Sequence, residues 1–396
     1  MVIDSNAMFV PDPISALGRV GSCASDEMAL PRKARGGDSV PIFGSPRRQP
    51  PAHVIAAAER VMKDTGYAPA RGLPLLREAI AARTERLTGI PVDPETQVVV
   101  TNGAMQALHI IMTALLQPGD EVVIPSPCFS YDGLVKLARG TAVYVPMQAE
   151  SEYAWDIDRI EAAIGASTKL LIVNTPTNPT GRVLSRSDLE RLDQIADRYR
   201  ILVVADEAYD RLVYDGRRHE SIYGVAEASE RTLLVQSATK SFAMGAWRVG
   251  WIVGPPTLAT IFAKMIEWMM LAGCHVSQAA VAAAIDGPED WLENLASEFQ
   301  RNRDLSAASL KRIGGLPFVV PQGGPFLLPD VSALGISGDD FAKLLILEYG
   351  LRVSGGGYYN SPDCIRIPFG GAPNAIEETF RRLEMAVRRQ QSRKSF

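Results

Sequence analysis

Short runs of β-branched and other apolar residues alternate along the chain with longer stretches in which apolar residues recur at helical spacing. The apolar runs cover residues 97–101, 120–125, 141–146, 169–174, 200–206, 231–237 and 250–254. Helical spacing occurs between them, for example over residues 104–116, 187–199 and 258–270. This alternation is typical of a doubly wound, mostly parallel sheet with helices on both faces, so the expected fold class is α/β.

The two ends of the chain follow a different pattern. Residues 51–88 have helical spacing with a Gly/Pro interruption at 66–74, whereas the first 50 residues are rich in Pro, Gly, Ser and Arg and have no clear period. Beyond residue 286, a long helix is expected over 290–310, followed by mixed strands and helices. We therefore predict a large α/β/α domain over residues 51–286. A smaller α+β domain is predicted from residues 287–396 together with an N-terminal arm, residues 1–50.

The composition narrows the classes of function. The 396 residues are 46% hydrophobic and 22% charged, which is ordinary for a globular protein, and the net charge of −4 disfavours a dedicated nucleic-acid-binding protein. The four cysteines and four histidines form neither a CxxC pair nor a metalloprotease motif, so we expect no disulfide scaffold and no metal. No apolar run reaches about 18 residues and the N-terminus does not resemble a secretory signal. We expect a cytoplasmic protein with no membrane partner.

Residues with specific chemistry follow four of the predicted strands, where ligands bind in open α/β sheets. Asn102-Gly103-Ala104-Met105 opens a helix after the strand at 97–101. A helix N-terminus presents backbone N–H groups to an anion such as phosphate, although a plain βα turn has the same sequence character. The run NTPTNPTG (174–181) follows another strand. Its prolines make a rigid loop that either aims an amide side chain or is only a turn.

The other two strand ends carry charges. Asp206 ends a very apolar strand, where a carboxylate needs a cationic partner, either an arginine from elsewhere or a protonated heterocycle. Lys240 follows the strand at 231–237 with few acids near it, which favours the neutral amine that Schiff-base chemistry needs, whereas a lone loop lysine is usually just solvated. Arg248 offers a guanidinium to phosphate oxygens. Together, the anion site, amide, carboxylate and lysine match a phosphorylated pyridine aldehyde.

Several longer segments resemble the class I/II aminotransferases, the fold-type I enzymes that depend on pyridoxal 5′-phosphate (PLP) and include the aspartate aminotransferases. They are GYAPARGLPLLREAIA (66–81), VTNGAMQAL (100–108), PGDEVVIPSPCF (118–129), NTPTNPTG (174–181), VVADEAYDRLVYDGRRHESI (203–222), SATKSFAMGAWRVGW (237–251) and CIRIPFGG (364–371). The resemblance spans about residues 40–390, and its motifs are specific in combination. It implies a fold-type I enzyme that transfers an amino group between an L-amino acid and a 2-oxo acid.

The resemblance also implies roles for individual residues around PLP. Lys240 matches the lysine that forms a Schiff base with the cofactor and moves the substrate proton, and Asp206 matches the aspartate that pairs with the pyridine nitrogen. Tyr209 and Asn178 match the groups that bond the 3′-oxygen of the ring, and Phe129 falls where an aromatic ring stacks on the pyridine. The positions that match the phosphate-binding turn and its partners are Gly103, Ala104, Met105, Ser237 and Arg248.

Three further matches concern the substrate and a partner subunit. Arg366 matches the arginine that holds the substrate α-carboxylate, next to Asn178, and Gly44 matches a backbone contact to the substrate. Tyr67 falls where the family has a tyrosine that reaches the phosphate in the neighbouring subunit. The resemblance therefore implies a homodimer with shared active sites.

Two segments depart from the family pattern. Residues 353–359 (VSGGGYY) stand where the family has Val-Pro-Gly-x-x-Phe-Gly, and residues 321–326 (PQGGPF) differ from the usual aromatic-bearing turn. These departures leave open an alternative in which the same residues serve elimination, replacement, cyclisation or condensation on an amino acid. A regulator that senses PLP is disfavoured, because about 40 Pro/Gly-rich N-terminal residues show no helix-turn-helix pattern.

Overall fold

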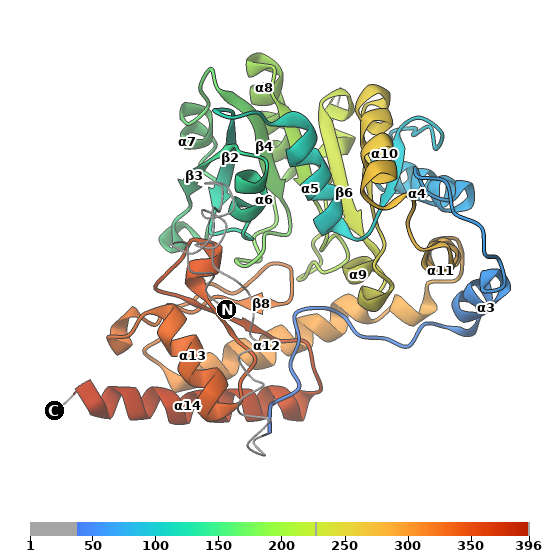
Figure 1. Ribbon diagram of the computed structural model, residues 1–396. Helices are drawn as coiled ribbons and strands as arrows, with labels where there is room; N and C mark the ends of the chain where they lie inside the picture. The colour runs from blue at the N-terminus through green and yellow to red at the C-terminus, as the bar shows by residue number, and fades with distance from the viewer. Residues whose placement is uncertain (1–37, 226–227, 395–396) are drawn as a thin grey trace, which may run out of the picture.

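A seven-stranded sheet forms the centre of the computed structural model, which describes residues 38–225 and 228–394 (Figure 1). Its strands are β1 (Val98–Thr101), β2 (Glu121–Ser126), β3 (Thr141–Pro146), β4 (Thr168–Asn174), β5 (Leu202–Asp206), β6 (Thr232–Ser237) and β7 (Gly250–Val253). Their order is β1-β7-β6-β5-β4-β2-β3, and β7 alone in this sheet runs antiparallel to its neighbours. The predicted α/β class and each predicted strand of the sheet are confirmed.

Helices cover both faces of this sheet, because successive strand residues point into two different apolar cores. In β1, Val98 and Val100 belong to one core and Val99 to the other, and all three are buried. The core around Val99 includes side chains from α5 (Ala104–Leu115), α6 (Asp132–Leu137) and α10 (Pro256–Met270). The opposite core includes side chains from α3 (Ala52–Val61), α4 (Pro74–Thr88), α7 (Ile157–Ala162), α8 (Arg186–Tyr199) and α11 (His275–Asp286).

The polar strand ends meet at one edge of the large sheet. Asn174 of β4 is level with Asp206 of β5, and Ser237 of β6 is level with Gly250, which is also level with Thr101 of β1. Short elements leave this edge or connect the strands: η1 (Ala149–Ser151), η2 (Ile222–Gly224), η3 (Ala228–Glu230), α9 (Ala238–Ser241) and η4 (Gly245–Trp247). The sheet topology therefore brings chemically distinct residues from four strands to the same place.

A second, antiparallel sheet lies beside this edge and has the order β8-β10-β9. Its strands are β8 (Phe326–Leu327), β9 (Ser354–Gly355) and β10 (Ile365–Pro368). The helices packed with it are α12 (Leu295–Ile313), α13 (Gly338–Tyr349) and α14 (Pro373–Lys394), with the 3₁₀ turns η5 (Asp290–Leu292), η6 (Ser332–Leu334) and η7 (Gly356–Tyr359). The helix expected over 290–310 is divided into η5 and α12, because the backbone at Asn294 is not helical (φ −96°, ψ 8°).

The segment from residue 38 to 45 joins the small sheet. Phe43 N–H donates to the Gly370 carbonyl at 2.9 Å, and Gly370 N–H donates to the Phe43 carbonyl at 3.0 Å. Of the expected arm over residues 1–50, residues 1–37 lie outside the described residues, and the domain boundaries at residues 51 and 286 stay predictions. No helix within residues 38–225 and 228–394 is both long and apolar enough to cross a membrane.

Candidate active site

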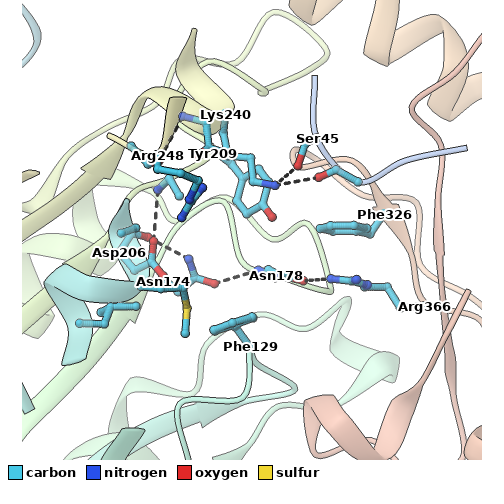
Figure 2. Close-up of a pocket in the computed structure, with 17 residues that line it drawn as sticks. Ser45, Phe129, Asn174, Asn178, Asp206, Tyr209, Lys240, Arg248, Phe326 and Arg366 are labelled. Carbon is cyan, nitrogen blue, oxygen red and sulfur yellow. Dashed lines mark hydrogen bonds between the residues drawn. The ribbon is translucent and has the colours of Figure 1, made fainter. Parts of the chain in front are cut away.

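A cavity of about 390 Å³ lies at the polar edge of the large sheet, next to the small sheet (Figure 2). This volume is within the range of small-molecule sites. The predicted site residues that line it are Gly44, Ala104, Met105, Phe129, Asn178, Asp206, Tyr209, Ser237, Lys240, Arg248 and Arg366. Of the remaining two, Gly103 packs against Arg248, whereas the Tyr67 residue is 85% exposed and does not line the cavity.

Lys240 lies on the four-residue helix α9, directly after β6. Its Nζ donates a hydrogen bond to the Gly44 carbonyl at 3.1 Å and another to the Ser45 hydroxyl, and it lies 5.5 Å from the centre of the Tyr209 ring. Burial, together with the positive charges of Arg366 and Arg248, lowers the pKa of Lys240 to about 7, although Asp206 opposes this shift. The amine is therefore partly neutral near neutral pH, which is the form that attacks a carbonyl carbon.

Asp206 is a buried carboxylate at the end of β5. The Tyr131 hydroxyl donates to its Oδ2 at 2.7 Å, and the Ala208 N–H donates to its Oδ1 at 3.3 Å. Burial raises the pKa of Asp206 even though both hydrogen bonds oppose the shift. In the described part of the chain, Asp206 has no ion pair within 4 Å, and the charge of Lys240 attracts it only at longer range. These residues therefore do not supply the directly paired cation that its burial requires.

The N-terminus of α5 and Arg248 form one end of the cavity. Gly103 is the N-cap of α5 and has a positive φ of 81°. As at any helix start, the first backbone N–H groups of α5 have no intrahelical acceptor. A Cβ on Gly103 would lie 2.4 Å from Arg248 Nη2, so only glycine permits this close approach. Arg248 is fixed by a hydrogen bond from Nη1 to the Gly245 carbonyl at 3.0 Å. A helix N-terminus beside a guanidinium is suited to a phosphate group.

A row of hydrogen bonds runs from the large sheet to Arg366 of the small sheet. Asn174 Nδ2 donates to the Asp206 carbonyl at 2.8 Å, and Asn178 N–H donates to Asn174 Oδ1 at 2.8 Å. Arg366 Nη1 then donates to Asn178 Oδ1 at 3.1 Å, as the dashed lines in Figure 2 mark. The Asn178 amide therefore faces the cavity in a fixed orientation.

Two aromatic rings contact the Arg366 guanidinium. The guanidinium carbon lies 3.9 Å from the centre of the Phe326 ring and 4.5 Å from the centre of the Tyr359 ring. Arg366 Nη2 also lies 3.5 Å from the Ser354 hydroxyl. Ser354, Tyr359 and Phe326 belong to the two segments that depart from the family pattern, so these segments position an arginine at the cavity.

The family assignment follows from a comparison of the sequence. The sequence model described as "Aminotransferase class I and II" matches residues 43–383. The chain belongs to this aminotransferase family.

Individual relatives and solved structures agree with this assignment. The chain is 35% identical to an aspartate aminotransferase of Pyrococcus abyssi, over 87% of this chain and 90% of that protein. It is 33% identical to aromatic-amino-acid aminotransferase 2 of Thermococcus litoralis, over 87% of this chain and 90% of that protein. The structure of the Thermus thermophilus aspartate aminotransferase with maleate matches with a TM-score of 0.89 at 32% identity, over 96% of this chain and 100% of that chain.

The chain is therefore a PLP-dependent aminotransferase, which transfers an amino group between an amino acid and a 2-oxo acid. Nothing in the comparisons favours elimination, replacement, cyclisation or condensation instead. The residues at the cavity fit PLP: a buried carboxylate without a cationic partner, an amine with a pKa of about 7, and a glycine turn against a guanidinium. No group of three His, Cys, Asp or Glu side chains in residues 38–225 and 228–394 is placed to hold a metal ion.

Some residues at the aminotransferase site were not singled out from the sequence. Tyr131 reaches Asp206 across 75 positions of the chain, Ser45 reaches Lys240 across 195, and Asn174 links Asp206 to Asn178. Asn174 carried a signal, because it stands at a strand end in the run 174–181. Tyr131 and Ser45 carried none, since only the folded chain brings them to the cavity.

Proposed function

We propose that Lys240 binds PLP covalently through Nζ and moves the substrate proton. The observation that carries this proposal is the position of Nζ in the cavity with a pKa of about 7. PLP, when bound, supplies an electron-withdrawing ring that stabilises negative charge at the substrate Cα. Once released from its covalent bond, Lys240 takes the proton from Cα, holds it at Nζ and returns it, and a pKa near neutrality suits both directions of transfer.

Asp206 is proposed to bind the protonated ring nitrogen of the cofactor. Its carboxylate is buried and has no cationic partner among the described residues, so a cation in the cavity removes the cost of its burial. The Tyr131 hydroxyl keeps the carboxylate in one orientation by donating to Oδ2. In this arrangement Asp206 holds a proton on the ring nitrogen.

The phosphate is proposed to bind at the N-terminus of α5, beside Arg248. The backbone N–H groups at the start of α5, which include those of Ala104 and Met105, follow Gly103 there, and Arg248 and the Ser237 hydroxyl lie beside them. The guanidinium and the helix N-terminus both favour a doubly charged anion. This end therefore fixes the cofactor without taking part in proton transfer.

Tyr209, Asn178 and Phe129 are proposed to hold the ring of the cofactor. Asn174 accepts from the backbone N–H of Asn178, and the Asn178 side-chain oxygen accepts from Arg366 Nη1. Tyr209 lies beside Lys240, and both Tyr209 and Asn178 line the cavity, which supports their proposed bonds to the 3′-oxygen of the ring. Phe129 lies at the cavity wall with its ring edge-on to Tyr131, at 5.5 Å between centroids, and offers a flat surface for stacking.

Arg366 is proposed to bind the substrate α-carboxylate, with Gly44 as a backbone contact. The two aromatic rings around the guanidinium limit its motion, and a fixed guanidinium can bind both carboxylate oxygens. Anchoring the carboxylate orients the Cα–H bond toward Lys240, which lowers the entropic part of the barrier. The Gly44 carbonyl accepts from Lys240 Nζ, so Gly44 lies within reach of the same substrate.

We also propose a homodimer in which Tyr67 contributes to the partner's phosphate site. Tyr67 is 85% exposed, and Arg71, four residues further along the chain, donates from Nη2 to the Thr260 hydroxyl of α10 at 3.1 Å. Trp268 of α10 is 90% exposed, and large exposed aromatic side chains of this kind favour a protein interface.

Mixed dimers test this proposal. A dimer of one Lys240→Ala and one Tyr67→Ala subunit has one intact site if the sites are shared. Mixing equal amounts of the two inactive variants under exchange conditions is expected to restore roughly a quarter of wild-type activity, since half of the dimers are hybrids with one intact site of two. No recovery, despite hybrids verified by mass, would contradict shared sites.

A cytoplasmic location is also proposed. Its support is that Cys128, Cys274 and Cys364 are unpaired in the described structure, as is usual in reducing compartments. Fractionation of the native cells tests it directly.

A single-substrate experiment tests the proposed function. The PLP-loaded protein is mixed with one amino acid in the absence of any 2-oxo acid, and the cofactor is followed by absorbance. We expect one equivalent of 2-oxo acid per site and conversion of the cofactor to its aminated form, with no further turnover. Continuous product formation without that conversion would instead identify an elimination or replacement enzyme.

A further inference from the structure

The three residues with the proposed catalytic roles, Asp206, Tyr209 and Lys240, are each followed in the sequence by a buried polar residue that does not line the cavity. The pairs are Asp206–Glu207, Tyr209–Asp210 and Lys240–Ser241. The second members are at most 6% exposed, and the hydrogen bonds of their side chains go to other buried groups. The two segments that carry the proposed catalytic residues are therefore held by hydrogen bonds on the side that faces away from the cavity.

Ser241 and Asp210 connect these two segments directly. The Ser241 hydroxyl donates to Asp210 Oδ1 at 2.6 Å, and Arg83 Nη2 donates to Asp210 Oδ2. Arg83 Nη1 also donates to Gln236 Oε1 at 2.8 Å, on the strand that leads into α9. Burial alone would raise the pKa of Asp210, but the charges of Arg83 and His219 and the bond from Ser241 outweigh it and lower that pKa. Asp210 is therefore a stable buried anion.

Glu207 fixes the same loop at a second point. Its carboxylate accepts hydrogen bonds from the Ser221 hydroxyl at 2.8 Å and from the Ile222 N–H at 3.3 Å, and it pairs with His219 Nε2 at 2.9 Å. Burial opposes a charge on His219, yet Glu207 and Asp210 raise its pKa. We call Arg83, Glu207, Asp210, His219 and Ser241 the rear cluster.

Helix α9 cannot hold its own position. It has only four residues, Ala238–Ser241, and a helix this short has little stability of its own. Its start is fixed by the Ser237 hydroxyl, which accepts from the Thr239 N–H at 3.1 Å. At its end, the Ser241 hydroxyl donates to Asp210 Oδ1 at 2.6 Å. Lys240 lies between these two points, so a change at Ser241 shifts the backbone that carries Lys240.

We propose that Ser241 and Asp210 are positioning residues that hold Lys240 Nζ in line with the cofactor and substrate. This inference rests on the proposed role of Lys240. It predicts that loss of the Ser241 hydroxyl slows every step in which Lys240 Nζ takes part, beyond the loss of stability that any buried hydroxyl would cause.

Ser241→Ala is the test variant, and Ser309→Ala is the matched control. Ser309 is also buried and accepts a hydrogen bond, from Arg312 at 2.9 Å, but it lies on α12 and does not line the cavity. The readouts are the rate of PLP uptake by apoenzyme, kcat, KM and Tm. We expect Ser241→Ala to lower the uptake rate and kcat by about tenfold, with KM changed less than about twofold, because misplacement of a reacting group costs rate. Ser309→Ala is expected to lower Tm similarly while both rates stay at the wild-type level.

The Asp210→Asn variant distinguishes an effect on the position of Lys240 from an effect on the stability of the fold. Its amide oxygen still accepts from Ser241, whereas the buried Arg83 loses its anionic partner, so this variant is expected to be the least stable and yet faster than Ser241→Ala. Rates that simply follow Tm across the three variants would overturn the inference. If Asp210→Asn does not fold, the comparison of the two serine variants is sufficient. Equal PLP-uptake rates and equal kcat in Ser241→Ala and Ser309→Ala would overturn the inference. Schiff-base formation with PLP, followed by its absorbance, that persists in Lys240→Ala would instead refute the proposed function.

Discussion

At the residue scale, burial and three neighbouring charges set the pKa of Lys240. Burial and the guanidinium groups of Arg366 and Arg248 favour the neutral amine, and Asp206 favours the ammonium ion. The resulting pKa of about 7 means that the neutral amine and the ammonium form of Lys240 are both populated at neutral pH. The residue proposed to anchor the substrate therefore also tunes the proposed base.

Removal of the Arg366 charge is expected to raise the pKa of Lys240. PLP uptake by the apoenzyme needs the neutral amine, so in the wild type its rate rises with pH through a midpoint near 7. In Arg366→Gln a repelling cation is gone, the ammonium ion is more stable, and the midpoint moves to higher pH. The same variant should lose about 100-fold or more in kcat/KM. Arg352→Gln is the control, since Arg352 is not among the groups that shift Lys240. An unchanged midpoint in Arg366→Gln would refute the electrostatic argument.

Asp206 is expected to trade stability for function. Because burial raises its pKa in the folded chain, its ionisation costs stability as pH rises through that pKa, and no cost arises well below about pH 4. Apo Asp206→Asn should therefore be more stable than the wild-type apoenzyme at pH 7, by about 1 kcal/mol, and equally stable in strong acid. With PLP added, it should bind more weakly and lose about 100-fold or more in kcat. Thermal melts across pH, with and without PLP, check the direction of both effects, on apo stability and on PLP binding. An apo variant that is less stable than the wild type and binds PLP with unchanged affinity would refute both predictions.

At the scale of elements, the start of α5 depends on a glycine that no other residue can replace. Gly103 combines a φ of 81° with a close approach to Arg248, and Gly250 of β7 packs against the Gly103 backbone. The contact sets the distance between the helix N-terminus and the guanidinium. Both groups are proposed to bind the same phosphate.

Gly103→Ala is expected to weaken PLP binding through the phosphate. The new Cβ displaces Arg248, so the Kd for PLP should rise at least about tenfold, which corresponds to about 1.4 kcal/mol. The affinity for pyridoxal, which has no phosphate, should change little. Gly89→Ala is the matched control, because Gly89 also has a positive φ of 75° but open space where its Cβ would lie. Equal losses for PLP and pyridoxal would show that the effect is not at the phosphate.

The sequence predicted the positions of the strands better than it predicted strand direction and the contacts between distant segments. Apolar runs located the strands because strands buried on both faces need continuous apolar sequence. The direction of β7 was not predictable, since an antiparallel strand in a mixed sheet has the same composition as a parallel one. The bond from Tyr131 to Asp206 was missed for a similar reason: it depends on where the chain after β2 passes β5, which local patterns do not encode.

At the scale of the whole molecule, the cavity is assembled from three separate parts of the chain. The large sheet supplies Asp206 and Lys240, the small sheet supplies Arg366, and the segment at residues 43–45 touches Lys240 directly. Motifs predicted most of the lining residues, but the aromatic pair around Arg366 could be found only in the fold, because Phe326 and Tyr359 are brought together by different strands and turns. The two segments that depart from the family pattern thus supply the aromatic rings that contact Arg366.

The central claim is that Lys240 is the residue that binds PLP covalently. It is tested most directly by reducing the PLP-loaded protein with borohydride and locating the modified residue by peptide mass spectrometry. We predict one label per chain, on the peptide that contains Lys240, and none in Lys240→Ala, which should also have no measurable turnover. A label on a different lysine, or a Lys240→Ala variant that keeps both label and activity, would contradict the account.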